Sequence, residues 1–170
     1  MVGNLSTPNG SVAEMQASVL SQLTYGENLN DLSKANVGQF ILNASQYPVL
    51  REYTNFTEIR LFCRKPALHS RTVDVAITVD EQIYDYLLNK DFSGSYCDKT
   101  YRFLSGDNSL LSGVACNKLL FTGYGYSITG AIIYKIYNYH VIFEVSHGRF
   151  ECDDHHENKS IGDVWKYYVR

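Results

Sequence analysis

The segment TVDVAITV, residues 72–79, constrains the fold more than any other part of the sequence. Four apolar residues at odd positions alternate with small or polar residues at even positions: Val73, Val75, Ile77 and Val79 against Thr72, Asp74, Ala76 and Thr78. Successive side chains of a β-strand point to opposite faces, so this period of two predicts a strand with one buried and one solvent-facing side. Such a strand is typical of an antiparallel sheet.

Several other segments predict strands. They cover residues 39–42, 58–63 and 161–169, while the runs 131–136 and 139–145 predict a hairpin. The 14 Tyr and 8 Phe residues against 3 Pro fit this interpretation, because aromatic residues favour pleated sheets. We therefore expect a mostly β protein, with antiparallel lobes of the sandwich or jelly-roll type. Residues 80–90 are compatible with a short helix or a strand.

One helix is predicted near the amino end, at residues 12–23. Its apolar residues recur at steps of three and four: Val12, Met15, Val19 and Leu23. Ser11 and Glu14 before them have the spacing of a capping box. A helix of about 12 residues is marginal alone in water, so it must pack on its own domain or on copies of itself.

Changes of composition divide the chain into three parts. Residues 1–24 are expected to form a linker and the short helix, and the polar stretch 1–11 is typical of a tail. Residues 25–90 are expected to form a small β-rich lobe. Residues 91–170 are expected to form a carboxyl-terminal lobe resembling a sandwich, with the loop-like stretch 89–100 at the boundary.

The chain ends in SIGDVWKYYVR, which contains the only tryptophan. Trp165, Tyr167 and Val169 fall on one face of an extended strand. Chain ends usually fray, so side chains this large predict a terminal strand that is docked against other structure.

Charge limits the classes of partner. The net charge of −3 and the pI near 5.9 argue against a surface for nucleic acid or anionic lipid. No apolar run approaches the ~20 residues that span a bilayer, and the first ten residues lack the pattern of a signal peptide. We expect no nucleic-acid binding and no membrane insertion.

The four cysteines, Cys63, Cys97, Cys116 and Cys152, are spread without CxxC pairing, which disfavours a zinc knuckle. Two disulfides and four free thiols both remain possible, and the missing export signal favours free, buried thiols. Asn-x-Ser/Thr sequons point the other way, toward a secreted glycoprotein. They occur at Asn4, Asn9, Asn43, Asn55 and Asn158.

The sequence offers little catalytic chemistry. His155 and His156 in CDDHHEN are weak candidates for metal ligation, because adjacent residues of a strand point to opposite faces and a solvated loop explains the cluster better. No Ser-His-Asp set or carboxylate pair can be assigned. We therefore expect no enzyme activity, no cofactor and no resident metal.

Tyrosines give a candidate binding surface. Tyr124 and Tyr126 lie beside glycines in TGYGYS, and Tyr137 and Tyr139 flank a turn. Aromatic rings on loops combine an apolar face with a hydroxyl group, which suits recognition of sugars and proteins. We predict these four residues as receptor contacts.

Three segments resemble the distal, carboxyl-terminal region of bacteriophage tail fibres and tail spikes: GENLNDLSKANVGQFIL, FTGYGYSITGAIIYKI and GDVWKYYVR. The resemblance covers about a third of the residues. It implies a homotrimer at the distal tip of a virion fibre that binds a bacterial surface polysaccharide or an outer-membrane protein, without catalysis. The predicted helix would then be the stub of a trimeric shaft. Trp165, Tyr167 and Val169 would pack against a neighbouring subunit.

A second interpretation comes from the sequons. The chain would then be an ectodomain fragment of a secreted or animal-virus envelope glycoprotein that binds host cell-surface glycans. The cysteines separate the two interpretations: free thiols favour the fibre, and disulfides favour the glycoprotein.

Overall fold

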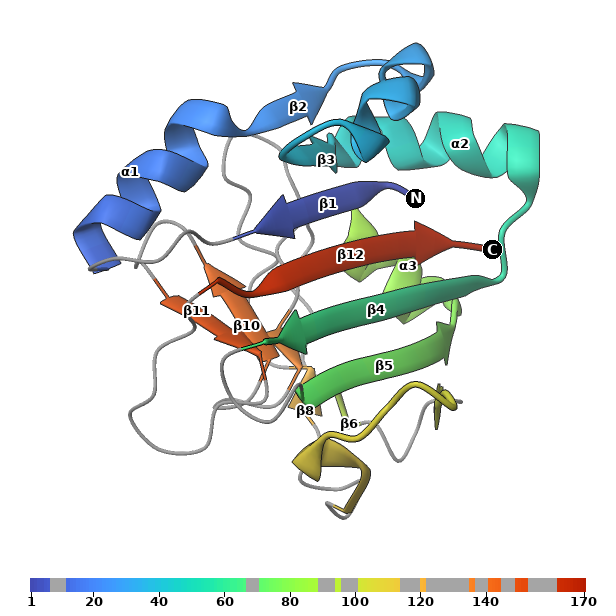
Figure 1. Ribbon diagram of the computed structural model, residues 1–170. Coiled ribbons are helices and arrows are strands. Elements are labelled where there is room, and N and C mark those ends of the chain that lie inside the picture. Colours follow the sequence, from blue (N-terminus) through green and yellow to red (C-terminus); the bar gives the residue numbers. More distant parts are fainter. Residues whose placement is uncertain are drawn as a thin grey trace.

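The computed structural model describes residues 1–6, 12–66, 71–88, 94–95, 101–113, 120–121, 135–136, 141–144, 149–152 and 162–170. The chain is mostly β, with one seven-stranded mixed sheet and a few short helices (Figure 1). The strand order in this main sheet is β2-β3-β1-β12-β4-β5-β7. The seven strands are β1 (Gly3–Ser6), β2 (Thr24–Gly26), β3 (Phe40–Leu42), β4 (Glu58–Lys65), β5 (Arg71–Thr78), β7 (Tyr101–Phe103) and β12 (Val164–Val169).

A second, smaller sheet has the order β11-β10-β9-β8-β6. Its strands are β6 (Gly94–Ser95), β8 (Leu120–Phe121), β9 (Lys135–Ile136), β10 (Val141–Glu144) and β11 (Arg149–Cys152). β9 and β10 pair antiparallel, which confirms the hairpin predicted from the sequence. A sandwich or jelly-roll arrangement and a trimer stay predictions.

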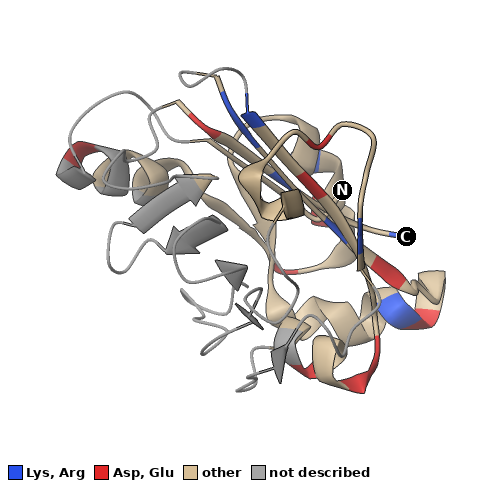
Figure 2. Ribbon diagram, turned by 90° about the horizontal axis from the view of Figure 1, so that it is seen from below, with Lys and Arg blue, Asp and Glu red and all other residues tan. Residues whose placement is uncertain are grey.

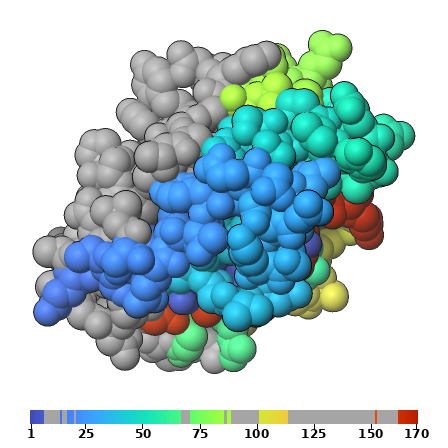
Figure 3. Space-filling view, turned by 90° about the horizontal axis from the view of Figure 1, so that it is seen from above, coloured from blue at the N-terminus to red at the C-terminus, as the bar shows by residue number. Residues whose placement is uncertain are grey.

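The helices are α1 (Val12–Gln22), α2 (Tyr47–Thr54) and α3 (Glu81–Leu87), with 3-10 turns η1 (Leu29–Asn36), η2 (Ala44–Gln46) and η4 (Leu110–Gly113). α1 confirms the predicted amino-terminal helix, and α3 decides the ambiguous stretch 80–90 in favour of a helix. α2 was not predicted, because its eight residues include Pro48 and Thr54 and give only a short apolar pattern. Viewed from above, α1, the segment from β2 to η1 and α2 form much of the surface (Figure 3).

The first residues form part of the fold, which corrects the expected tail. β1 lies between β3 and β12, and Val2 and Leu5 are buried. Gly3 is required there, because a Cβ atom at this position would lie 2.5 Å from Cδ2 of Tyr167. A strand of four residues is too short to give a periodic signal in a segment rich in Asn and Gly.

The main sheet also crosses the boundaries that composition suggested. β12 from the carboxyl end pairs with β1 from the amino end and with β4, and β7 pairs with β5. Strands from residues 1–24, 25–90 and 91–170 thus form one sheet. The three-part division predicted from the sequence does not correspond to separate structural units.

β12 is docked, as its side chains predicted. Trp165 and Tyr167 lie on the core side of the sheet and are 1 % and 3 % exposed, while Val169 is half-buried against the same core. Opposite them lie Cys63 and Leu61 of β4. The terminal strand is therefore held by β1 and β4 of its own chain.

The predicted pattern of β5 is correct on one side only. Val73, Val75 and Ile77 are buried as expected, but Asp74 and Ala76 on the other side are buried as well. The segment after β7 covers this edge, since Leu104 N–H donates to the Asp74 carbonyl at 2.8 Å. Asp74 also pairs with Arg60, which satisfies its carboxylate.

Candidate functional site

One side of the main sheet carries the even-numbered residues of β4, β5 and β12, with Arg102 of β7 and Arg170 after β12; we call it the open sheet face. The strand registers order these residues in rows from β5 to β12. The rows are Thr72, Arg64 and Val164; then Asp74, Phe62 and Lys166; then Ala76, Arg60 and Tyr168, with Arg102 beside Ala76.

The other side of the sheet is the core side. In Figure 1, α3, β10 and β11 lie behind β12, β4 and β5. The disulfide from Cys63 to β11 shows that this layer packs on the core side. Arg64 and Arg170 on the open sheet face are exposed, and the side chain of Arg60 remains 42 % accessible. The open sheet face is therefore accessible to a partner at these positions.

Basic residues outnumber acidic residues on the open sheet face: Arg60, Arg64, Arg102, Lys166 and Arg170 against Glu58 and Asp74. Five positive and two negative charges give a balance of +3, opposite in sign to the net charge of −3 for the chain. Figure 2 shows Lys and Arg distributed along the strands of this sheet. The distribution concentrates positive potential on one side of an acidic protein.

Arg60 is held by the buried carboxylate of Asp74. Its Nε and Nη2 atoms donate to the two oxygens of Asp74, each at 2.7 Å. These hydrogen bonds raise the pKa of Arg60. The guanidinium also lies 5.3 Å from the ring centroid of Tyr168 and 6.0 Å from that of Phe62. Arg60 thus lies near two aromatic rings, and its two hydrogen bonds to Asp74 fix its orientation.

Glu58 is shared by two cations at one end of the face. Arg102 Nη2 donates to its two oxygens at 2.9 and 3.0 Å, and Arg170 donates to Oε2. The Arg102 hydrogen bond, helped by the positive charge of both arginines, lowers the pKa of Glu58 against the opposing effect of burial. Glu58 therefore neutralises only part of the charge that these arginines supply.

Two cations have no such partner within the described part of the chain. Neither Arg64 nor Lys166 takes part in an ion pair there. Arg64 lies two residues along β4 from Phe62, and Lys166 is directly opposite Phe62 on β12. With Arg60, they place three cations around the half-buried Phe62 on β4 and β12, while Asp74, the partner of Arg60, lies opposite Phe62 on β5. This arrangement can hold an anionic group next to an apolar surface.

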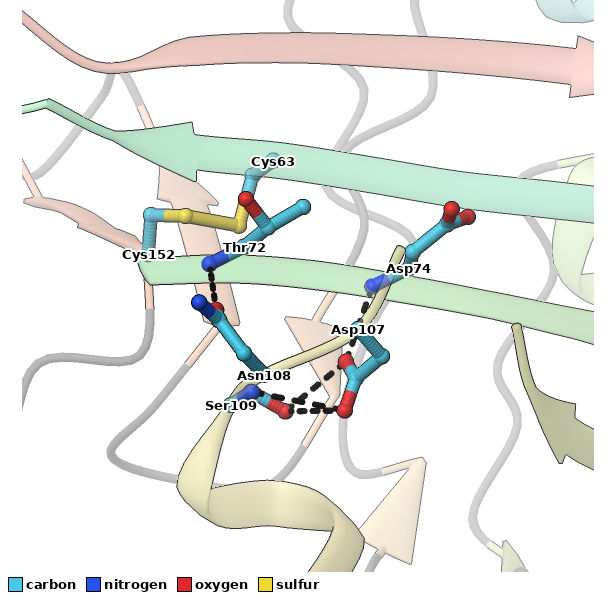
Figure 4. Close-up of a disulfide and its surroundings, with 7 residues drawn as sticks. All are labelled: Cys63, Thr72, Asp74, Asp107, Asn108, Ser109 and Cys152. Atoms are coloured by element: carbon cyan, nitrogen blue, oxygen red, sulfur yellow. Dashed lines mark hydrogen bonds between the residues drawn. A yellow bond between two sulfur atoms is a disulfide. The ribbon is translucent and has the colours of Figure 1, made fainter. Parts of the chain in front are cut away.

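A disulfide fixes the position of the smaller sheet. Cys63 of β4 and Cys152 of β11 are bonded, with their Cα atoms 5.9 Å apart and a sequence separation of 89 (Figure 4). Both are fully buried. The expectation of free thiols is therefore wrong for this pair, because the fold brings together two cysteines whose sequence separation gave no signal. Cys97 and Cys116 lie outside the described residues.

The neighbouring edge of β5 is fixed by polar contacts (Figure 4). Asp107 Oδ1 accepts from the Asp74 N–H at 3.0 Å, and Asn108 Oδ1 accepts from the Thr72 N–H at 2.6 Å. Ser109 Oγ donates to Asp107 Oδ1 at 2.9 Å. These bonds replace a strand partner at the end of β5, so they are structural contacts.

The loop residues predicted as contacts or ligands lie outside the described residues: Tyr124, Tyr126, Tyr137, Tyr139, His155 and His156. The role in assembly predicted for Trp165 and Tyr167 loses its basis, since one chain buries both rings by itself. Among the residues that the structure describes, no three metal-ligating side chains gather. None of the helices within that part is long and apolar enough to cross a membrane.

The open sheet face was not predicted from the sequence, although its residues show a recognisable pattern. Basic and aromatic residues alternate with apolar ones in RLFCR at 60–64 and in WKYYVR at 165–170. The pairing of these two segments could not be inferred, because strand order is not encoded locally. Comparison of the chain with family models, curated proteins and solved structures finds no match.

Proposed function

We propose that this chain is a noncatalytic binding domain of a secreted or envelope glycoprotein, and that it attaches to anionic polysaccharide on cell surfaces. The observation that carries the proposal is the open sheet face, with its excess of positive charge around Phe62 and Tyr168. Arg64 and Lys166 supply charge that nothing in the described part of the chain neutralises.

Anionic sugars fit this surface by their chemistry. Carboxylate and sulfate groups accept hydrogen bonds from guanidinium and ammonium groups, and arginine suits planar, two-point contacts. Aromatic rings offer an apolar surface to the non-polar faces of sugar rings, and the Tyr168 hydroxyl adds a polar contact. The rows of the open sheet face repeat this combination along β4 and β12, which suits a polymer more than a single small ion.

The disulfide supports the location that the proposal requires. Disulfides persist in oxidising, extracytoplasmic compartments and are rare in the cytosol. The tail-fibre interpretation expected free cysteines, so the bond between Cys63 and Cys152 favours the glycoprotein interpretation over it. Binding to bacterial surfaces and trimer formation stay predictions of the tail-fibre interpretation, and the described residues offer no specific observation in their favour.

The test is retention on immobilised heparin at physiological salt, with neutral dextran as the reference matrix. The double variant Arg64→Ala/Lys166→Ala removes the two unpaired cations. The control Lys34→Ala/Arg51→Ala removes the same charge from η1 and α2, outside the open sheet face. Arg64 is exposed and Lys166 is half-buried. Two charge contacts at about 0.7 kcal/mol each predict a roughly tenfold loss of affinity for the first variant.

The control is expected to bind nearly as well as the unmodified protein, and binding is expected to weaken as salt is raised. Equal losses in the two variants would mean that only net charge matters, and the open sheet face would then have no special role. Equal retention on heparin and dextran, or no retention on heparin, would overturn the proposal. Binding of the chain to an immobilised acidic protein, without binding to heparin, would assign the open sheet face to a protein partner.

A further inference from the structure

We infer that Asn55 carries an N-linked glycan and that the fold is built to accommodate one there. Three of the five sequons lie within the described residues, beginning at Asn4, Asn43 and Asn55. A sequon indicates only that the transferase could recognise the sequence. The structure distinguishes the three sites by what each asparagine side chain does.

Asn55 ends α2 in an outward-facing turn. Its backbone is left-handed, with φ 45° and ψ 43°, and it is the only non-glycine residue with positive φ in the described part of the chain. Asparagine is among the few residues that adopt this conformation readily. Its backbone N–H donates to the Arg51 carbonyl at 2.8 Å, which completes the helix end. The side chain is exposed and makes no hydrogen bond within the described residues.

The middle residue of this sequon anchors the turn. Phe56 is 2 % exposed and packs edge-on against Tyr47, with the ring centroids 6.4 Å apart. Thr57 is exposed again, and its backbone N–H donates to the Arg170 carbonyl at 2.7 Å. The buried Phe56 therefore leaves Asn55 and Thr57 on the surface, so a sugar on Asn55 displaces no packed group.

The asparagine side chains of the other two sequons already take part in hydrogen bonds within the fold. Asn4 lies in an interior strand of the sheet and donates from Nδ2 to the Gly38 carbonyl at 3.0 Å. Asn43 caps η2 by accepting from Ser45 N–H at 3.0 Å, and its Nδ2 donates to Glu27 at 3.4 Å. Both residues are half-buried. A glycan on either Nδ2 would compete with these contacts.

The chemistry is a transfer to the side-chain amide. The Asn55 Nδ2 atom forms a bond to the anomeric carbon of an oligosaccharide whose donor is a polyprenyl diphosphate. The bond between that carbon and the diphosphate oxygen breaks, the lipid diphosphate leaves with its electron pair, and Nδ2 loses one proton. The inference rests on the proposed extracytoplasmic location, because the donor and transferase act in the secretory compartment.

In the test, the full chain is expressed in mammalian cells with a signal peptide fused to its amino end. Total cellular protein and secreted protein are both analysed. Peptides are compared by mass spectrometry before and after an amidase that releases N-glycans and converts the modified Asn to Asp. The Asn55 peptide is expected to be occupied in most chains. Asn55→Gln and Thr57→Ala should each remove one glycan, whereas Thr57→Ser should keep it because the sequon is intact.

The outcomes separate this inference from the proposed function. An unmodified Asn55 peptide beside occupied Asn4 or Asn43 would overturn the inference and leave the extracytoplasmic location standing. A Cys63–Cys152 pair that stays reduced in the secreted protein would count against the location itself. Retention of the glycan in Thr57→Ala would overturn the assignment, because the modification would then not depend on this sequon.

Discussion

The disulfide between Cys63 and Cys152 should contribute a large share of the stability of this fold. It closes a loop of 89 residues, and constraint of the unfolded chain over that length is worth about 4.6 kcal/mol in the chain-entropy treatment. Single domains are commonly stable by only about 5–15 kcal/mol. We therefore predict that Cys63→Ala/Cys152→Ala folds marginally.

Urea unfolding followed by Trp165 fluorescence measures this effect. The only tryptophan is buried and lies opposite Cys63 in the register of β12 and β4, so its emission reports on this region. With a slope of about 2 kcal/mol per M, a loss of about 4.6 kcal/mol lowers the urea midpoint by about 2 M. Either single Cys→Ala variant should lose about as much as the double variant, because each breaks the same bond.

A midpoint that moves by less than about 0.5 M would refute this reasoning. It would mean that the smaller sheet contributes little to the stability of the main sheet, or that the unfolded chain keeps the two cysteines close without the bond. A lower slope in the variant would point to a more compact unfolded state, because the slope follows the surface exposed on unfolding.

Two further predictions concern ion pairs of the open sheet face. Asp74→Ala should lower the free energy of unfolding by about 1–3 kcal/mol, measured by the same urea titration, because it removes a buried bidentate partner of Arg60; an unchanged midpoint would contradict this. Glu58→Gln should cost up to about 1 kcal/mol at neutral pH. The pKa of Glu58 is lowered from its ordinary 4.5 in the folded state, so its contribution is present above that value and is lost as pH falls through the lowered folded pKa. The stability difference between the unmodified protein and Glu58→Gln should therefore shrink as pH falls below 4.5; a difference that persists in acid would exclude the charge of Glu58 as its cause.

Local pattern was sufficient to predict several elements. The alternation at 72–79 identified β5, and the spacing of large side chains after Gly162 identified β12 as a docked strand. α1 was recognised because its apolar residues recur over three turns. Each of these signals lies within one continuous segment, where side-chain direction follows from backbone period alone.

What the sequence did not predict depends on contacts between distant segments. β1 near the amino end pairs with β12 at the carboxyl end. The four residues of β1 are too few to show a period of two, so neither the strand nor its pairing could be predicted. The Cys63–Cys152 bond and the burial of Asp74 likewise require knowledge of strand order. The open sheet face forms only because β4 and β12 are neighbours in the sheet. The cluster of basic residues on it could therefore not be predicted from either segment alone.

A map of the binding surface by NMR tests most directly whether the open sheet face binds anionic polysaccharide. Backbone amide shifts of the folded, disulfide-bonded protein would be followed while a heparin oligosaccharide is added. We expect the largest shift changes on residues 60–64 and 164–170, and we expect Arg64→Ala/Lys166→Ala to weaken them together. Saturable changes confined to other parts of the chain, or no changes at all, would contradict the claim that the open sheet face is the binding surface.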